Sequence, residues 1–128
     1  MNSQRTASAD PGALRLDPRD PVVRGLRGLY WKRRNQDAEA LKEYLQASQL
    51  EPENPTWQVS MAEVYTRLGD LVSALAAYVK ATEMTPEVAE YWRLLSLFCS
   101  DNGVQVAEIG LPAAKKAVTL APNDAQAL

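Results

Sequence analysis

A spacing of 34 residues recurs along this chain of 128 residues and limits the folds that are open to it. Pro18, Pro52 and Pro86 are separated by 34 positions, and Pro122 follows 36 positions after Pro86. Alanine stands five residues before each of these prolines, and leucine or methionine stands two residues before. A fixed period of this length is the signature of repeat architectures. We therefore expect one supersecondary unit, copied three times and stacked on its neighbours.

Each unit has the pattern of two helices joined by a tight turn. Asp20-Pro21 and Asn54-Pro55 each combine an N-cap side chain with a proline suited to the first helical turn. In the middle unit, Gly69-Asp70 is typical of one helix ending and the next beginning. The predicted fold class is all-α, an α-α superhelix of three stacked helix-turn-helix units.

Small and large residues stand at matching positions of the units. Ala40 and Ala74 in the second helices should let the helix axes approach closely, and Tyr44 and Tyr78 should wedge between neighbouring helices. The first helix of the first unit is expected to bury an apolar stripe at helical spacing, made of Val23, Leu26, Tyr30 and Trp31.

The repeat spacing also predicts the organisation of the chain. The third unit is two residues longer than the others, and Pro112 should kink its second helix because proline removes a backbone donor. Neither end carries a capping helix, so we expect either a fragment of a longer protein or a last helix that packs on a partner. The expected segments are a flexible N-terminal stretch with the vestige of a preceding unit (1–20), the three units (21–54, 55–88 and 89–124) and the start of a following helix (125–128).

These residues resemble the tetratricopeptide repeat family, whose 34-residue helix-turn-helix pattern has the same small, aromatic and proline positions. The middle unit matches best, with Tyr65, Gly69-Asp70, Tyr78 and Pro86. The resemblance covers about residues 21–124. It implies a non-catalytic module that binds a peptide or protein partner on a concave face lined by the first helices.

The resemblance further implies which residues line that concave face. They mix aliphatic side chains with arginines, which can grip an extended segment that carries a carboxylate. An ordinary solvated face without a ligand is the alternative. The implied residues are Val22, Leu29, Lys32, Arg33, Thr56, Val59, Glu63, Arg67, Glu90, Arg93 and Leu97.

One class of partner is disfavoured by the resemblance itself. Tetratricopeptide domains that bind chaperone tails clamp a terminal carboxylate with lysine, asparagine and arginine side chains of the first helices. The corresponding positions here hold Gly25, Leu29, Ser60, Glu90 and Leu94. None of these residues matches the clamp.

The composition excludes most catalytic and metal-binding chemistry. Histidine is absent, which removes Ser-His-Asp triads and imidazole metal sites. The one cysteine, Cys99, takes the position of Trp31 and Tyr65 in the other units, so we expect a small buried residue there rather than a nucleophile. No glycine-rich phosphate loop is present. The sequence thus predicts no enzymatic activity, no cofactor and no metal.

Charge and hydropathy bear on the location of the chain and on its partners. The net charge is −2, yet five basic residues and no acidic residue lie between positions 21 and 36. We interpret this basic segment as favourable for a helix C-terminus, rather than as a nucleic-acid or lipid site. No stretch is long and apolar enough to predict membrane insertion, and no signal peptide is recognisable, so a cytoplasmic location is the default.

Three functions remain open at this point. The leading prediction is a protein-interaction module that uses the concave face. The alternative is an assembly spacer that self-associates, or joins a larger polypeptide, through its uncapped C-terminal helix. Binding of an anionic polymer through Arg24–Arg34 is the third.

Overall fold

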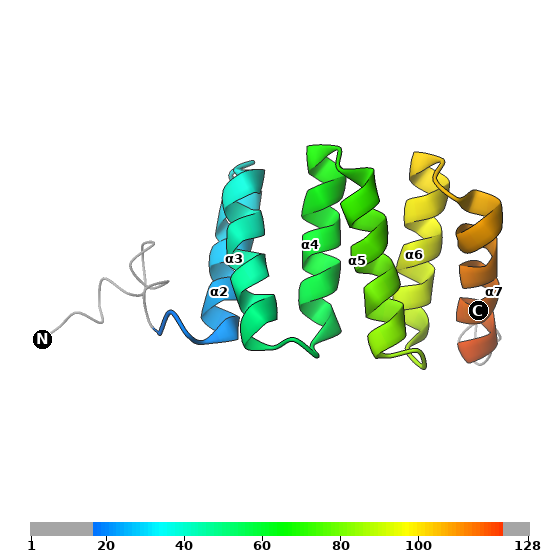
Figure 1. The fold of residues 1–128 in the computed structure, drawn as a ribbon, viewed down its shortest axis with the longest axis horizontal. Helices are drawn as coiled ribbons and strands as arrows, with labels where there is room; N and C mark the ends of the chain where they lie inside the picture. The colour runs from blue at the N-terminus through cyan, green and yellow to red at the C-terminus, as the bar shows by residue number, and fades with distance from the viewer. Residues whose placement is uncertain (1–16, 122–128) are drawn as a thin grey trace, which may run out of the picture.

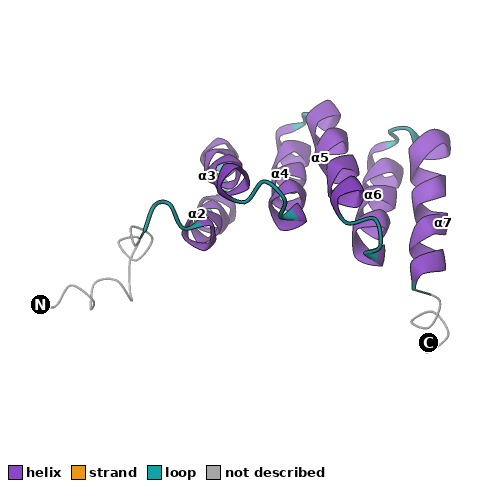
Figure 2. Cartoon of the chain, turned by 60° about the horizontal axis from the view of Figure 1, so that its bottom comes forward, coloured by secondary structure: helices purple, strands orange, loops and turns teal. Residues whose placement is uncertain are grey.

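The computed structural model describes residues 17–121, and this part of the chain consists of helices and loops without a strand (Figure 2). The helices stand side by side and are joined by turns at alternating ends, so neighbouring helices are antiparallel (Figure 1). This confirms the all-α fold. The elements are α2 (Pro21–Arg33), α3 (Asp37–Leu50), α4 (Pro55–Leu68), α5 (Leu71–Met84), α6 (Ala89–Asn102), the π-helical η2 (Val106–Gly110) and α7 (Leu111–Leu120).

Local capping fixes where the helices begin and end. Asp20 accepts a hydrogen bond from the Val22 amide, and Asn54 accepts one from the Thr56 amide, each ahead of a proline in the first turn. Gly69 adopts a left-handed conformation with φ of 83° and ends α4. Asp70 then caps α5 by accepting from the Ser73 amide. The predicted caps are confirmed.

The core lies between consecutive helices and uses the residues that repeat. Ala40 and Ala74 are completely buried, and Tyr44 and Tyr78 are 5% and 8% exposed. A Cβ atom on Gly28 would lie only 2.5 Å from the Tyr44 ring. The absence of a side chain at Gly28 therefore lets the tyrosine pack flat against α2, as the alternation of small and large residues predicts.

The connection from α6 to α7 is built differently from the other turns. Gly103 ends α6 in a left-handed conformation, and η2 runs directly into α7 with Pro112 in the first turn of α7. The Gly110 amide donates to the Gln105 carbonyl five residues earlier, which is π spacing. Proline is tolerated in a first helical turn because it needs no amide donor there. The helical spacing thus changes at Gly110, two residues before the position where the sequence predicts a kink.

Cys99 is completely buried, as predicted, and burial raises the pKa of its thiol. A Cβ atom on Gly110 would lie 2.9 Å from the Cys99 Cβ. Glycine therefore brings the end of η2 directly against the core.

One prediction about the core is wrong. Val23 is buried, whereas Leu26 is 51% exposed. The stripe model fails because Leu26 lies on the side of α2 that faces a groove shared with α4.

Three predictions fall wholly or partly outside the described residues. These are the flexible N-terminal segment with its vestigial unit, of which only residues 17–20 are described, the end of the third unit, and the following helix at 125–128. Among the helices of residues 17–121, none has the length and apolar character needed to cross a bilayer.

Candidate functional site

A groove runs between the first helices α2 and α4 and has a volume of about 330 Å³. Val22 and Leu26 stand at its edge with 60% and 51% of their surface exposed. We call it the α2–α4 groove. Its lining residues are Val22, Gly25, Leu26, Leu29, Lys32, Tyr44, Trp57, Ser60 and Glu63.

The floor of the α2–α4 groove is aromatic. The rings of Tyr44 and Trp57 stack with centroids 6.4 Å apart and an angle of 26° between their planes. The Trp57 ring fills the space where a Cβ atom on Gly25 would be. Because glycine leaves this space free, α4 can place its indole directly against the backbone of α2.

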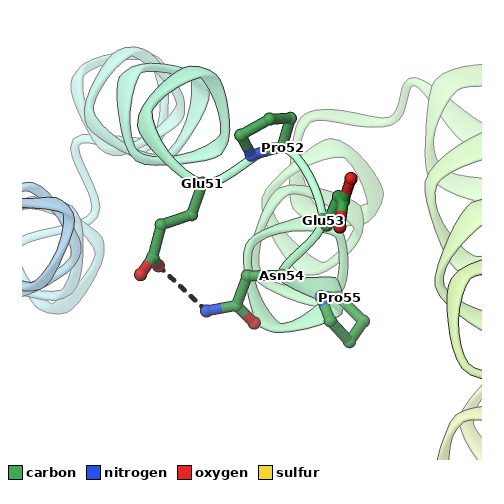
Figure 3. A pocket seen from close by; sticks show the side chains of 5 residues that line it. All are labelled: Glu51, Pro52, Glu53, Asn54 and Pro55. Carbon is green, nitrogen blue, oxygen red and sulfur yellow. Dashed lines mark hydrogen bonds between the residues drawn. The ribbon is translucent and has the colours of Figure 1, made fainter.

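The loop between α3 and α4 positions that indole. Glu51 accepts hydrogen bonds from the Asn54 side-chain amide at 3.0 Å and from the Trp57 indole at 2.7 Å. Figure 3 shows the first of these bonds within the shallow pocket of residues 51–55. The two bonds, that from Asn54 first, hold the pKa of Glu51 below its ordinary value. The carboxylate therefore ties the loop to the first turn of α4.

The far end of the groove carries an ion pair between the two helices. Lys32 Nζ on α2 donates to Glu63 Oε1 on α4 at 2.9 Å. Burial, and then the nearby Glu63 charge, raises the pKa of Tyr44 and raises the pKa of Tyr78 to about 12. Both tyrosines therefore stay neutral at physiological pH. The groove offers an apolar floor beside a compensated charge pair.

Arg67 ties the end of α4 to the α2–α3 turn. Its Nη2 donates to Asn35 Oδ1 at 2.9 Å and to the Lys32 carbonyl at 3.4 Å. The same nitrogen lies 3.0 Å from Asp37 Oδ1, although that buried oxygen accepts no hydrogen bond from it. Arg67 thus pairs with the Asp37 carboxylate by charge, in addition to its hydrogen bonds to Asn35 and to the Lys32 carbonyl.

A second groove lies between α6 and α7 and has a volume of about 510 Å³. It is walled mainly by small apolar residues, and Leu97 and Val118 are 43% and 64% exposed. No other helix of residues 17–121 occupies it. We call it the α6–α7 groove, lined by Ala89, Glu90, Arg93, Ser96, Leu97, Ala114, Ala117, Val118 and Ala121.

The structure distributes the residues predicted for one concave face between the two grooves and the rest of the molecule. Val22, Leu29, Lys32 and Glu63 meet in the α2–α4 groove. Three others line the α6–α7 groove: Glu90, Arg93 and Leu97.

The remaining predicted residues line neither groove. Val59 packs against the core cluster of α4, α5 and α6. Arg67 is engaged at the α2–α3 turn, and Arg33 and Thr56 are exposed on the surface.

Five residues of the α2–α4 groove were missed by sequence reasoning: Gly25, Leu26, Tyr44, Trp57 and Ser60. A signal for one of them was available. The 34-residue shift aligns Leu26 with the polar Ser60, which indicates a surface position rather than a buried one.

The basic segment of α2 is largely engaged within the molecule. Arg24 Nη1 bonds Glu43 Oε1 at 3.0 Å, and the Arg34 guanidinium lies 4.6 Å from the centre of the Tyr30 ring. Lys32 pairs with Glu63 across the α2–α4 groove. In the described part of the chain, no group of three or more Cys, Asp or Glu residues is placed to hold a metal ion.

Comparison with known proteins identifies the family. A family model described as Tetratricopeptide repeat matches residues 33–97, half of the chain. No curated protein matches.

Solved structures share the fold. A crystal structure of MamA superposes with a TM-score of 0.74 at 18% identity, over 87% of this chain and 64% of that one. The Sgt2 TPR domain from Aspergillus fumigatus gives 0.70 at 22% identity, over 80% of this chain and 67% of that one. The first TPR of Spaghetti (RPAP3), bound to the HSP90 peptide SRMEEVD, gives 0.70 at 19% identity, over 84% and 83%. The chain thus spans less than two thirds of the MamA structure, and it belongs to the tetratricopeptide repeat family.

Proposed function

We propose that the chain is a non-catalytic protein-interaction module that binds an apolar segment of a partner in the α2–α4 groove. The observation that carries this proposal is the exposure of Val22 and Leu26 above the Tyr44 and Trp57 rings. Aliphatic side chains held half in water over an aromatic floor gain from being covered. Membership of a family of helical repeats supports a binding role over a catalytic one, although fold alone does not define function.

The charges of the groove bear on the chemistry of the partner. Lys32 is compensated by Glu63 at 2.9 Å, so the groove presents little net charge to a ligand. Its other polar lining residue is Ser60, and Gly25 and Leu29 carry no charge. These residues favour an apolar segment over an acidic chaperone tail.

A charge placed in the groove tests the proposal. Leu29→Glu should abolish capture of a partner from a cell extract without lowering the helical circular dichroism signal. Val72→Glu is the matched control, because Val72 is 82% exposed on α5 and lines neither groove. Capture should survive Val72→Glu, and capture that also survives Leu29→Glu would place the binding site elsewhere.

The α6–α7 groove supports a second function, which is assembly with another copy through the last described helix. Val118 is 64% exposed beside Ala114 and Ala117, and such small residues allow a helix to approach closely. Light scattering should then give a mass above 14.1 kDa. Val118→Lys should restore the single-chain mass, and Val72→Lys should not. A single-chain mass for the unaltered protein at high concentration contradicts assembly.

A further inference from the structure

The positions that hold Arg24 and Glu43 in the first unit carry different residues in the other units. In the first unit, Arg24 on α2 and Glu43 on α3 form an ion pair at 3.0 Å, with side chains only 18% and 16% exposed. The 34-residue shift places Gln58 on α4 and Ala77 on α5 at the same positions of the second unit. A further shift places Trp92 there in the third unit, and this ring packs against the core.

Gln58 has kept a polar group but lacks the partner that Arg24 has. It is only 8% exposed, and its side chain makes no hydrogen bond to any residue between 17 and 121. A carboxamide carries two N–H donors and an acceptor oxygen. These atoms are not themselves fully buried, because Asp37 Oδ1 is the one buried side-chain oxygen or nitrogen without a partner in residues 17–121, so the carboxamide reaches the surface and is free to bond a ligand. The methyl group of Ala77, where the first unit has the Glu43 carboxylate, supplies no acceptor.

Gln58 opens into a groove of about 260 Å³ between α3, α4 and α5. Met61 and Tyr65 provide an apolar wall from α4, and Leu45, 37% exposed, stands at the α3 side. Lys80 lies on the α5 side, and no lining residue is acidic. We call it the α3–α5 groove. It shares no lining residue with the α2–α4 groove or with the α6–α7 groove.

We propose that the α3–α5 groove is a second binding site, which takes a glutamate side chain of a partner peptide together with a neighbouring aliphatic side chain. The ligand carboxylate takes the place that Glu43 has in the first unit. It accepts a hydrogen bond from Gln58 Nε2 and pairs with the Lys80 ammonium. The aliphatic side chain covers Leu45, which is 37% exposed, beside the buried Met61.

The charge of the groove selects an acidic ligand over a basic one. Lys80 is the one charged lining residue, so a carboxylate is attracted to the groove and an ammonium is repelled. Hydrogen bonds that involve an ionised acceptor are also stronger than neutral ones. The site is independent of the α2–α4 groove, and its test does not depend on the function proposed above.

A short peptide probes the site directly. The probe is acetyl-Ala-Leu-Glu-Leu-Ala-amide, and its control has glutamine in place of glutamate. Titration followed by NMR should shift the side-chain amide signals of Gln58 and the backbone amide signals of Ala77 and Lys80. The glutamine peptide should shift them far less. If a glutamine peptide with a free C-terminal carboxylate binds as well as the probe, the assignment to a glutamate side chain is wrong.

Variants separate the groove from general surface charge. Lys80→Glu should weaken binding of the glutamate peptide about fivefold, as expected for reversing one partner of an exposed ion pair. Lys116→Glu makes the same charge change at the aligned position of the third unit and should leave the affinity unaltered. Equal weakening by both variants would show a nonspecific charge effect and overturn the proposal.

A double substitution blocks the site without removing side-chain volume from the core. Gln58→Arg together with Ala77→Glu copies the ion pair of the first unit into the second. This variant should keep its helical circular dichroism signal and lose the peptide-induced shifts. Retention of the Lys80 shift with unaltered affinity would contradict the proposal.

Discussion

The face of the first unit that receives α4 and the face of the third unit that forms the α6–α7 groove are built from aligned positions. In the first, Tyr44 is 5% exposed and stacks on Trp57 of the incoming helix. In the third unit, whose second helix is shifted by 36 residues rather than 34, the aligned residue is Ala114, which lines an open groove. The backbone pattern is shared, and the side chains decide whether a face becomes interior or surface.

The glycines show the same difference. Gly25 and Gly28 bring the aromatic rings of neighbouring helices against α2. Their aligned residues in the third unit are Arg93 and Ser96, and both line the α6–α7 groove. A repeat that carries side chains at these positions is not shaped to receive an indole as the first unit does.

The largest expected effect comes from removing the Tyr44 ring, which fills the contact between the first unit and α4. Tyr44→Ala should lower the free energy of unfolding by about 3 kcal/mol, because a large buried ring leaves a cavity between α2, α3 and α4. Ala114→Tyr, the reverse change at the aligned position, should alter it by less than about 1 kcal/mol, because the groove has room. Urea unfolding measures both. Equal losses would show that the two faces are packed alike.

Adding a side chain at Gly28, which packs against the Tyr44 ring, should have the next largest effect. Gly28→Val should cost about 2 kcal/mol, since its Cβ would lie 2.5 Å from the Tyr44 ring and force the ring to move. Ser96→Val at the aligned position of α6 should change stability by about 0.5 kcal/mol or less. Thermal unfolding of the two variants compares them. A tolerated Gly28→Val would contradict the close approach of α2 and α3.

The sequence predicts the parts of this fold that local chemistry determines. Asn54, Gly69 and Asp70 cap helices through contacts within a few residues, so their roles can be predicted from the neighbouring sequence alone. The burial of Tyr44 and Tyr78 follows from a period that the sequence displays directly. For these features, pattern and structure agree.

The candidate site is less predictable because it depends on contacts between distant residues. Lys32 and Glu63 are 31 residues apart, and their pairing is set by how α4 lies on α2. Arg67 has a charge that suits ligand binding, yet its side chain bonds Asn35 in the α2–α3 turn. The two residues are 32 positions apart, so the residues around Arg67 do not predict this bond. The π spacing at Gly110 likewise occurs where the chain lies directly against Cys99 of α6, a contact that no local pattern displays.

Ion pairs offer a finer comparison of the two grooves. A double-mutant cycle with Lys32→Met and Glu63→Gln should give a coupling energy of about 0.5 kcal/mol, because the pair is partly exposed. Glu90 and Arg93 are paired at 2.7 Å within one helix and should couple by about 0.3 kcal/mol. Both couplings should shrink in 1 M salt. A salt-insensitive coupling at Lys32 would indicate a more buried pair than the structure has.

The smallest effect concerns pH and compares two loops that each hold an indole. In the α3–α4 loop, the Trp57 indole donates to the Glu51 carboxylate, whereas in the α5–α6 loop the Trp92 indole donates to the Pro86 carbonyl, which does not titrate. The pKa of Glu51 is lowered in the folded chain by the bonds from Asn54 and Trp57. The carboxylate therefore stabilises the fold above its ordinary value of 4.5, and this contribution is lost as the pH falls through the lower folded value.

Two variants isolate this contribution from those of the other carboxylates. Glu51→Gln should reduce stability at pH 7, and the gap from the unaltered chain should narrow as the pH is lowered below 4.5, because a protonated Glu51 is also neutral. Trp92→Phe removes the other indole bond, and its cost should be the same at neutral and at acidic pH. Urea unfolding across this range measures the two gaps. A Glu51→Gln gap that stays constant with pH would mean that the carboxylate does not hold the loop by its charge.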